Sequence, residues 1–204
     1  MTDDRDRPLD RADLDPDPVR QLLAWQAEAR AAGIQLSEAA ALATATADGA
    51  PSVRMVLVKD VDDDGLTFFT CYESRKGREL AENPRAALLL YWHDLGRQAR
   101  VEGPVERLSP EESDAYFRSR PVGSRLSAAV STQSEVIESR EQLEQAAAAL
   151  GRFVGDDVPR PERWGGYRLR PGLWEFWQHR VDRLHDRFRY RPDDRGWIVE
   201  RLAP

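Results

Sequence analysis

Apolar residues recur at roughly helical spacing in the first part of the chain that is expected to fold, between residues 22 and 34. Asp17 followed by Pro18 supplies an N-cap and a proline in the first helical turn. Folded structure is therefore expected to begin at Asp17, with a helix that starts at Pro18.

Short β-rich runs follow this helix and are separated by turn dipeptides. Asp48-Gly49 and Asp64-Gly65, which are typical of hairpin turns, divide residues 40–70 into three predicted antiparallel strands. Two further strands are predicted over residues 86–92 and 97–108, joined by a short turn. The middle of the chain is thus expected to form a sheet of hairpins.

Helix starts and a second group of strands complete the pattern. Ser109 and Glu112 form a capping box, and Ser139 and Gln142 predict a second box that opens an alanine-rich helix ending at about Leu150. Four strands are then predicted, over residues 164–171, 173–178, 183–190 and 196–202. The fold class expected from this order is mainly β with peripheral helices, an antiparallel barrel in one domain over residues 17–204.

Cations occupy alternate positions in the predicted strand over residues 183–190. Arg183, His185, Arg187 and Arg189 alternate with mostly apolar residues. A period of two places alternate residues on one face of a strand, so a cationic face that suits a phosphate ester is predicted here. A solvated edge strand, whose arginines pair with surface carboxylates, explains the same pattern.

Composition narrows the possible classes of protein. The apolar fraction of 41% and the six tryptophans favour a packed globule, whereas the 32% of charged residues predict a polar surface. Residues 1–16 are rich in aspartate and are expected to form a mobile acidic arm.

No leader and no membrane-spanning run is found, so a cytoplasmic location without membrane contact is expected. The net charge of -6 disfavours nucleic acid, and one cysteine with three separated histidines argues against a metal centre.

Cations and hydroxyls gather where a strand gives way to a helix near residue 74. Arg75 and Lys76 follow Ser74 at the predicted helix start, and Arg54 lies in a neighbouring apolar strand. Backbone N–H groups and the helix dipole favour an anion at such a position. A phosphate site is one interpretation, and a solvated first helical turn is the other.

A second candidate phosphate site contains Tyr116, Arg120 and Ser124 near a helix exit. Tyr116 in the core and Arg120 as a helix-end charge explain the same residues. Gln98 is a possible partner for a heterocycle, and Trp177 is interpreted either as core or as a stacking surface. No catalytic triad or paired-carboxylate site is found, so the reactive group of an enzyme would come from a cofactor.

Eight motifs in a fixed order resemble the pyridoxine/pyridoxamine 5′-phosphate oxidase family over roughly residues 17–204. They are RMVLVK, SRKGREL with NPRAALLLYW, RQARVEG, YFRSRP, STQSE, EFWQ, RLHDRF and the terminal RLAP, of which RLHDR and RLAP are the most specific. The resemblance implies a homodimeric split β-barrel that binds FMN at the subunit interface. It also implies oxidation of pyridoxamine 5′-phosphate or pyridoxine 5′-phosphate to pyridoxal 5′-phosphate, with oxygen reoxidising the flavin to hydrogen peroxide.

The resemblance also implies roles for individual residues of this chain. The implied FMN contacts are Arg54, Met55, Val56, Leu57, Phe69, Thr70, Arg75, Lys76, Gln98, Gln133, Ser134, Trp177 and Arg187. The implied substrate-phosphate contacts are Lys59, Tyr116, Arg120 and Ser124. Arg183 and His185 match the residues that lie against the substrate ring, and they are the implied catalytic residues. Hydride transfer from the substrate C4′ carbon to flavin N5 would then depend mainly on aligned rings.

Two departures from the family pattern keep alternatives open. The N-terminal arm lacks an Arg-Arg-x-Tyr-like element, and residues 179–181 (HRV) replace a turn that typically contains glycine. The alternatives are the related FMN oxidases of phenazine biosynthesis and a flavin-binding protein without turnover. The four implied phosphate contacts favour a phosphorylated substrate over a phenazine.

Overall fold

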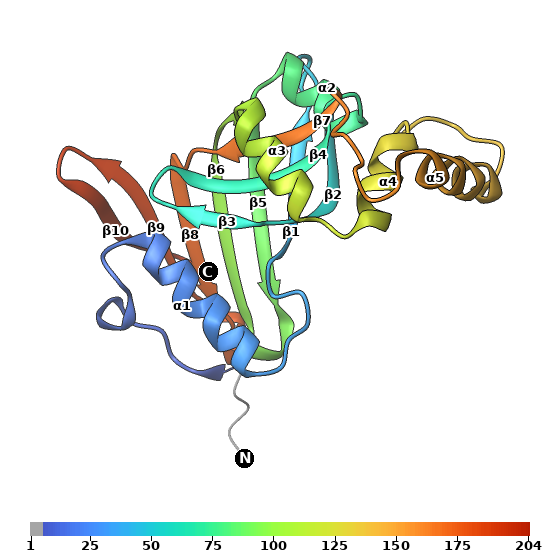
Figure 1. The fold of residues 1–204 in the computed structure, drawn as a ribbon. Coiled ribbons are helices and arrows are strands. Elements are labelled where there is room, and N and C mark those ends of the chain that lie inside the picture. Colours follow the sequence, from blue (N-terminus) through green and yellow to red (C-terminus); the bar gives the residue numbers. More distant parts are fainter. Residues whose placement is uncertain (1–5) are drawn as a thin grey trace.

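One antiparallel sheet of ten strands forms the centre of residues 6–204, the part of the chain that the computed structural model describes (Figure 1). Seven strands follow the order β10-β9-β8-β6-β5-β1-β2, and β7, β4 and β3 branch from β6. The strands are β1 (Ala39–Ala45), β2 (Pro51–Leu57), β3 (Asp60–Asp62), β4 (Gly65–Cys71), β5 (Arg85–Trp92), β6 (Arg97–Arg107), β7 (Trp164–Leu169), β8 (Leu173–Gln178), β9 (Asp186–Asp193) and β10 (Gly196–Leu202). The predicted antiparallel, mainly β class is confirmed.

The long strand β6 curls the sheet because it changes partners along its length. It pairs with β5 over residues 97–104, with β8 over residues 97–102 and with β7 over its last three residues. At the change of partner, a Cβ on Gly103 would lie 1.9 Å from the carbonyl oxygen of Arg170, so only glycine fits. Beyond this point β7, β4 and β3 cross in front of β5 and β6 (Figure 1).

Five α-helices surround the sheet in the described residues. They are α1 (Pro18–Ala31), α2 (Arg75–Glu82), α3 (Pro110–Ser119), α4 (Val122–Val130) and α5 (Arg140–Val154), with short 3-10 turns η2 (Arg11–Asp13), η3 (His93–Leu95) and η4 (Val181–Arg183). Helices α4 and α5 pack on each other and project to one side of the molecule (Figure 1). None of the helices in residues 6–204 is long and apolar enough to cross a membrane.

Local helix signals in the sequence are confirmed. The side chain of Asp17 accepts a hydrogen bond from the N–H of Val19, and Ser109 and Glu112 form the expected capping box. Ser139 caps α5 through the N–H of Gln142, but the reciprocal bond of the predicted capping box is not formed, and the helix continues to Val154 rather than ending at about Leu150.

Aromatic and aliphatic side chains fill the inner face of the curled sheet. Trp25 of α1 meets Phe176 of β8 edge to face, with ring centroids 5.1 Å apart. Trp92, Trp174 and other inward side chains are fully buried beside them. Burial of each such large apolar side chain contributes about 1.5–3 kcal/mol. The core therefore fixes α1 against β8.

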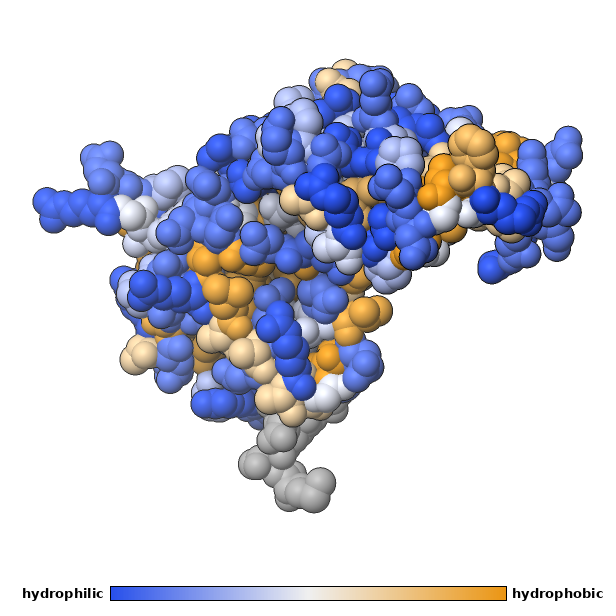
Figure 2. All heavy atoms as spheres, in the orientation of Figure 1, coloured by the Kyte–Doolittle hydropathy of each residue, from blue (hydrophilic) through white to orange (hydrophobic). Residues whose placement is uncertain are grey.

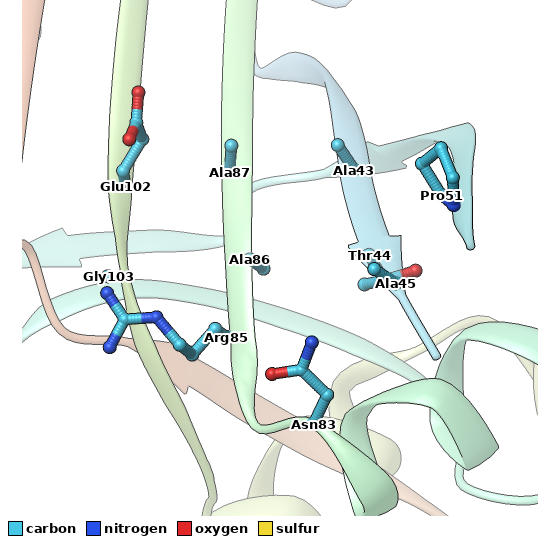
Figure 3. A pocket seen from close by; sticks show the side chains of 10 residues that line it. All are labelled: Ala43, Thr44, Ala45, Pro51, Asn83, Arg85, Ala86, Ala87, Glu102 and Gly103. Carbon is cyan, nitrogen blue, oxygen red and sulfur yellow. The ribbon is translucent and has the colours of Figure 1, made fainter. Parts of the chain in front are cut away.

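The outer face of the sheet near β1 and β2 is apolar but uncovered. Alternate residues of β1 on this face are alanines, and Val53, Met55 and Tyr91 are 68%, 63% and 52% exposed. A shallow hollow of about 350 Å³ lies at the ends of β1 and β5, where the register partners Ala43 and Ala87 leave space (Figure 3). The surface seen in Figure 2 is largely hydrophilic, with apolar side chains over α4 and α5 and around α1.

The N-terminal segment differs from the expectation of a mobile arm over residues 1–16. Residues 1–5 lie outside the described residues, but the segment that follows packs against the C-terminal strands. Leu9 is 5% exposed and donates its N–H to Asp186, and Arg201 binds Asp10 at 2.6 Å. Folded structure therefore begins before Asp17, because these aspartates have partners that are distant in sequence.

The predicted strand over residues 183–190 starts too early. β9 begins at Asp186, and Arg183 belongs to the 3-10 turn η4 instead. Asp182 and Arg183 adopt left-handed backbone angles, with φ of 58° and 62°, which a strand does not permit. Arg183 and His185 therefore do not share a strand face with Arg187 and Arg189, and the prediction of one continuous cationic face is wrong.

Candidate functional site

The start of α2 is held tightly against the end of β4. Ser74 caps the helix by accepting the N–H of Gly77. A Cβ on Gly77 would lie 2.1 Å from the carbonyl oxygen of Tyr72, so glycine is required for this close approach. The contact fixes the first helical turn, which carries Arg75 and Lys76.

Lys76 is a buried cation surrounded by neutral acceptors. Its Nζ atom donates to Thr70 Oγ1 at 3.1 Å, to Gln133 Oε1 at 3.0 Å and to Ser74 Oγ at 3.3 Å. Burial, and then the charge of Arg54, lower the pKa of Lys76. A bound anion would offset both effects, so the surroundings of Lys76 favour an anionic ligand.

Arg54 and Arg75 meet at one carboxylate. Arg54 Nη2 lies 3.2 Å from Glu79 Oε2, and Arg75 Nε donates to Glu79 Oε1 at 2.9 Å. The backbone N–H of Arg75 also donates to Ser134 Oγ at 3.2 Å. We call Arg54, Arg75, Lys76 and Glu79 the α2 cluster. With three cations and one carboxylate it keeps an excess of positive charge, as an anion site requires.

A pocket of about 410 Å³ opens beside the α2 cluster. Aromatic rings form one wall, where Phe69 stacks on Tyr116 with centroids 3.8 Å apart. The predicted residues that line it are Leu57, Lys59, Phe69, Thr70, Tyr116, Arg120, Ser124 and Gln133. The structure therefore brings the four implied substrate-phosphate contacts together, next to several of the implied FMN contacts.

Arg120 is the most unusual charge in this pocket. Its guanidinium lies over the ring of Trp164 at 4.7 Å, and its buried Nη1 atom has no hydrogen-bond partner. No carboxylate among residues 6–204 forms an ion pair with it, and burial lowers its pKa. Burial also raises the pKa of the neighbouring Tyr116 hydroxyl, which stays protonated as a donor. A buried cation without a counter-ion is expensive unless an anion binds beside it.

A second pocket, of about 340 Å³, lies on the outer face of β6, β8 and β9. Gln98, Trp177 and Arg187 are register neighbours on these three strands and line it. Arg187 Nε donates to Glu175 at 2.8 Å, and Arg100 Nη2 donates to the same carboxylate at 2.6 Å. This pocket collects three of the implied FMN contacts.

His185 lies at the edge of the second pocket, two residues after Arg183, the last residue of the η4 turn. The His185 ring lies 4.5 Å from that of Trp177, and its Nδ1 atom accepts the N–H of Arg180 at 3.1 Å. Desolvation lowers the pKa of His185, and the charges of His179, Arg183 and Arg187 lower it further. The ring is therefore neutral near pH 7 and leaves its Nε2–H free to donate.

The predicted site residues thus divide into two groups in one chain. β2 carries members of the first group and β8 carries a member of the second. The two strands are four positions apart in the sheet order, which corresponds to about 19 Å across the sheet. Met55 is exposed on the outer face of β2, whereas Val56 packs against the core. One chain therefore does not gather all the residues around one ligand.

Several residues of these pockets were missed by the sequence reasoning. Trp164, Glu79, Glu175 and His179 contact predicted residues, and Arg100 binds Glu175 and lines the second pocket. Only Glu79 has a local signal, because it lies one helical turn after Arg75. Glu175 meets Arg100 and Arg187 through strand pairing. Trp164 meets Arg120 at the end of α3, and His179 meets His185 in the connection between β8 and β9. Among the described residues, no group of three or more His, Cys, Asp and Glu side chains is arranged to hold a metal.

Comparison with solved structures identifies the fold. PhzG from Burkholderia lata, in complex with tetrahydrophenazine-1-carboxylic acid, is 39% identical and superimposes with a TM-score of 0.92, covering 98% of this chain and 100% of that one. A pyridoxamine 5′-phosphate oxidase-related, FMN-binding protein from Nostoc punctiforme is 18% identical, with a TM-score of 0.74 over 92% of this chain and 98% of that one. The fold is that of the FMN-binding split β-barrel proteins, as the sequence predicted.

Family models and curated relatives define the class further. The pyridoxamine 5′-phosphate oxidase model matches residues 26–152, and the pyridoxine 5′-phosphate oxidase C-terminal dimerisation region matches residues 164–204. A pyridoxine/pyridoxamine 5′-phosphate oxidase from Burkholderia multivorans is 55% identical over 96% of this chain and 93% of its own length, and one from Paraburkholderia phymatum is 53% identical with the same coverage. The chain belongs to the pyridoxine/pyridoxamine 5′-phosphate oxidase family, a family of flavin-dependent oxidoreductases.

The residues present fit a flavin mononucleotide. The α2 cluster offers a phosphate three cations at a helix N-terminus, and the buried Lys76 has neutral acceptors only among its hydrogen-bond partners. Trp177 and Gln98 on the outer sheet face supply an aromatic surface and an amide, which suit a flat heterocycle.

Proposed function

We propose that the protein catalyses FMN-dependent oxidation of pyridoxamine 5′-phosphate and pyridoxine 5′-phosphate by oxygen, giving pyridoxal 5′-phosphate and hydrogen peroxide. The observation that carries the substrate assignment is the Nη1 atom of the half-buried Arg120 side chain, which is buried and has no hydrogen-bond partner. Lys59, Tyr116 and Ser124 line the same pocket and supply an ammonium and two hydroxyls. A phosphate monoester satisfies all four groups, because its oxygens accept charge-assisted hydrogen bonds.

FMN is the proposed cofactor. Its phosphate is assigned to Arg54, Arg75 and Lys76, with Ser134 and Gln133 beside them. When bound, it would accept a hydride from the substrate and pass the electrons to oxygen. The remaining proposed contacts are Met55, Val56, Leu57, Phe69, Thr70, Gln98, Trp177 and Arg187.

A homodimer is part of this proposal. The two groups of proposed FMN contacts are four strands apart in one chain, and one flavin reaches both only if each group comes from a different subunit. The uncovered apolar face with Val53, Met55 and Tyr91 lies between them and is suited to a second copy. The match of residues 164–204 to a dimerisation region supports the same arrangement.

Arg183 and His185 are the proposed catalytic residues. A neutral His185 would donate from Nε2 and orient the substrate ring, since its Nδ1 already accepts the N–H of Arg180. Arg183 would stabilise negative charge on the ring oxygen of the substrate. Arg183 has left-handed backbone angles, and strain of this kind is common at functional sites.

A phenazine-type oxidation is the second candidate, because PhzG is similar over its whole length. The two functions differ in whether the 410 Å³ pocket binds a phosphate group of the substrate. A phenazine carboxylate has no phosphate ester, so it leaves Lys59 and Ser124 without an evident role. The proposed function predicts that the phosphate of the substrate is essential.

The decisive experiment is oxygen-dependent formation of pyridoxal 5′-phosphate by FMN-loaded protein, followed by product absorbance and a coupled peroxide assay. Rapid turnover of pyridoxamine 5′-phosphate, with weak turnover of unphosphorylated pyridoxamine, is expected. Turnover of a dihydrophenazine carboxylate without turnover of the B6 phosphates would favour the second candidate. FMN-bound protein that is inactive on both would refute the proposed function.

A further inference from the structure

Glu79 is a buried carboxylate in the midst of the cations proposed to hold the flavin phosphate. Its side chain is only 4% exposed, and it lies on α2 one turn after Arg75. A carboxylate next to an anion site opposes the anion, so its presence there requires a reason.

The contacts of Glu79 tie three elements together. It accepts from Arg75 Nε of α2 at 2.9 Å, from Ser52 Oγ of β2 at 2.6 Å and from Thr44 Oγ1 of β1. Arg54 Nη2 of β2 lies 3.2 Å from the same carboxylate. Both arginines are thereby fixed by one group. Arg75 is otherwise exposed, whereas Arg54 also donates from Nη1 to the carbonyl oxygen of Leu42 at 3.3 Å.

Thr44 and Ser52 reinforce the position of Arg54. Arg54 Nη1 donates to Thr44 Oγ1 at 2.5 Å and Nη2 donates to Ser52 Oγ, while both hydroxyls donate to Glu79. Each hydroxyl therefore donates its proton to the carboxylate and accepts one N–H of the guanidinium. Removing the carboxylate frees both hydroxyls to rotate and leaves the carbonyl oxygen of Leu42 as the only fixed acceptor of Arg54 in the described residues.

The negative charge of Glu79 also lowers the net positive charge of the α2 cluster. Three cations and one carboxylate leave a formal charge of +2 in the α2 cluster. A phosphate monoester carries about -1.5 to -2 at pH 7, so the cluster matches it closely. Without a ligand, Glu79 keeps two like-charged guanidinium groups close together.

We propose that Glu79 is a positioning residue of the flavin phosphate site, which orients Arg54 and Arg75 and adjusts the charge of the site to a phosphate dianion. The proposal rests on the proposed function only in that FMN is the ligand. It is independent of which substrate is oxidised.

The test compares the dissociation constants of FMN and riboflavin, measured by quenching of flavin fluorescence on flavin-free full-length protein. Riboflavin lacks the phosphate, so the ratio of the two constants isolates that site. Glu79→Ala is expected to raise the dissociation constant of FMN at least about tenfold, because Arg54 and Arg75 lose the carboxylate that orients them. The dissociation constant of riboflavin is expected to change little. For Glu79→Gln the dissociation constant of FMN is expected to stay within about threefold of the wild-type value, because the amide oxygen still accepts from one arginine and the amide N–H groups can donate to the hydroxyls of Ser52 and Thr44.

Salt dependence supplies a second readout that does not depend on the alanine variant folding. Glu79→Gln raises the formal charge of the α2 cluster by one, so FMN affinity is expected to fall more steeply with ionic strength than in the wild type. Glu82→Gln makes the same change of charge at an exposed position of α2 and is the matched control.

The outcomes separate this inference from the proposed function. If the wild type prefers FMN to riboflavin and the Glu79 variants keep both that ratio and the wild-type salt dependence, the role of Glu79 is refuted and the flavin site stands. A purely structural role would lower the melting temperature without changing the ratio, and it would refute the proposal equally. If the wild type does not prefer FMN, the assignment of the flavin phosphate fails and the role of Glu79 fails with it.

Discussion

Arg187 donates from Nε to Glu175 Oε1 over 2.8 Å, and the other oxygen of that carboxylate accepts from Arg100 at 2.6 Å. Glu175 is 7% exposed, so it has little water to replace either arginine. Loss of one partner from such a buried network costs more than loss of a surface ion pair. Glu175 therefore holds Arg187 at the second pocket much as Glu79 holds two arginines at the first.

The first prediction concerns Glu175→Gln. We expect the free energy of unfolding to fall by about 1–3 kcal/mol, because two charge-assisted hydrogen bonds become neutral ones. FMN affinity should fall as well, since Arg187 loses its orientation. Chemical denaturation and flavin titration measure the two effects. Glu200→Gln is the control, because Glu200 also binds two arginines, Arg189 and Arg191, but at a more exposed site. Equal effects of both variants would contradict the prediction.

A second prediction separates the two ends of the substrate. Arg120→Met should raise the KM for pyridoxamine 5′-phosphate about tenfold to a hundredfold, the usual effect of losing one charged hydrogen bond. The KM for unphosphorylated pyridoxamine should change little. Arg118→Met removes an exposed charge from the same helix and is expected to behave as wild type. Equal losses on both substrates would show that Arg120 does not serve the phosphate.

Local signals in the sequence were sufficient for much of the fold. Asp17, Ser109 and the hairpin dipeptides act on residues next to them, so their effects follow from the sequence alone. The second capping box indicated where α5 begins but not where it ends. Helix ends depend on packing, and α5 continues along α4 to Val154.

Long-range contacts explain the predictions that were wrong. The aspartate-rich N-terminus looked disordered by composition, yet Asp6 binds Arg180 at 3.2 Å and Asp10 binds Arg201. Alternation alone suggested a strand at Arg183, although left-handed backbone angles at two non-glycine residues form a turn there. The division of the site into two groups follows from the pairing of β6 with β8, which no local pattern reveals.

A third prediction tests the role of Arg183. Arg183→Leu should retain FMN, because no proposed flavin contact is removed, and should lose most turnover, roughly a hundredfold if the residue stabilises charge in the transition state. Arg191→Leu removes an exposed arginine from β9 and is the control. Steady-state kinetics and flavin content are measured on the same preparations. Unchanged kinetics in Arg183→Leu would exclude the catalytic role.

Acid sensitivity provides a fourth prediction. Burial alone would raise the pKa of Glu79, but hydrogen bonds from Ser52, Thr44 and the two arginines outweigh burial and lower it to about 2. A carboxylate whose pKa is lower in the folded state stabilises the fold above its unfolded pKa, and this contribution is lost as pH falls from about 4.5 towards 2. Wild-type stability should therefore fall more steeply over this interval than that of Glu79→Gln. Parallel pH profiles from chemical denaturation would contradict this.

The final prediction concerns the protonation of His185, whose ring lies 5.5 Å from that of His179. Desolvation lowers the pKa of His185 first, and positive charge on His179, Arg183 and Arg187 lowers it further. Its Nδ1 atom also accepts the N–H of Arg180, a bond that protonation would break. His179→Gln removes one of the cations but leaves the desolvation, so the pKa of His185 should rise while remaining below 6.5.

Titration of the histidine ring protons by NMR measures this directly, with His93→Gln as the control at an exposed site. Because the folded pKa lies below the unfolded value, neutral His185 stabilises the fold above pH 6.5, and this contribution is lost as pH falls through the folded pKa. The His179→Gln variant should therefore lose less stability on acidification. If catalysis needs neutral His185, the activity of the His179→Gln variant should begin to fall at a higher pH than that of the wild type when the solution is acidified. An unchanged His185 titration in His179→Gln would show that the two rings are not coupled.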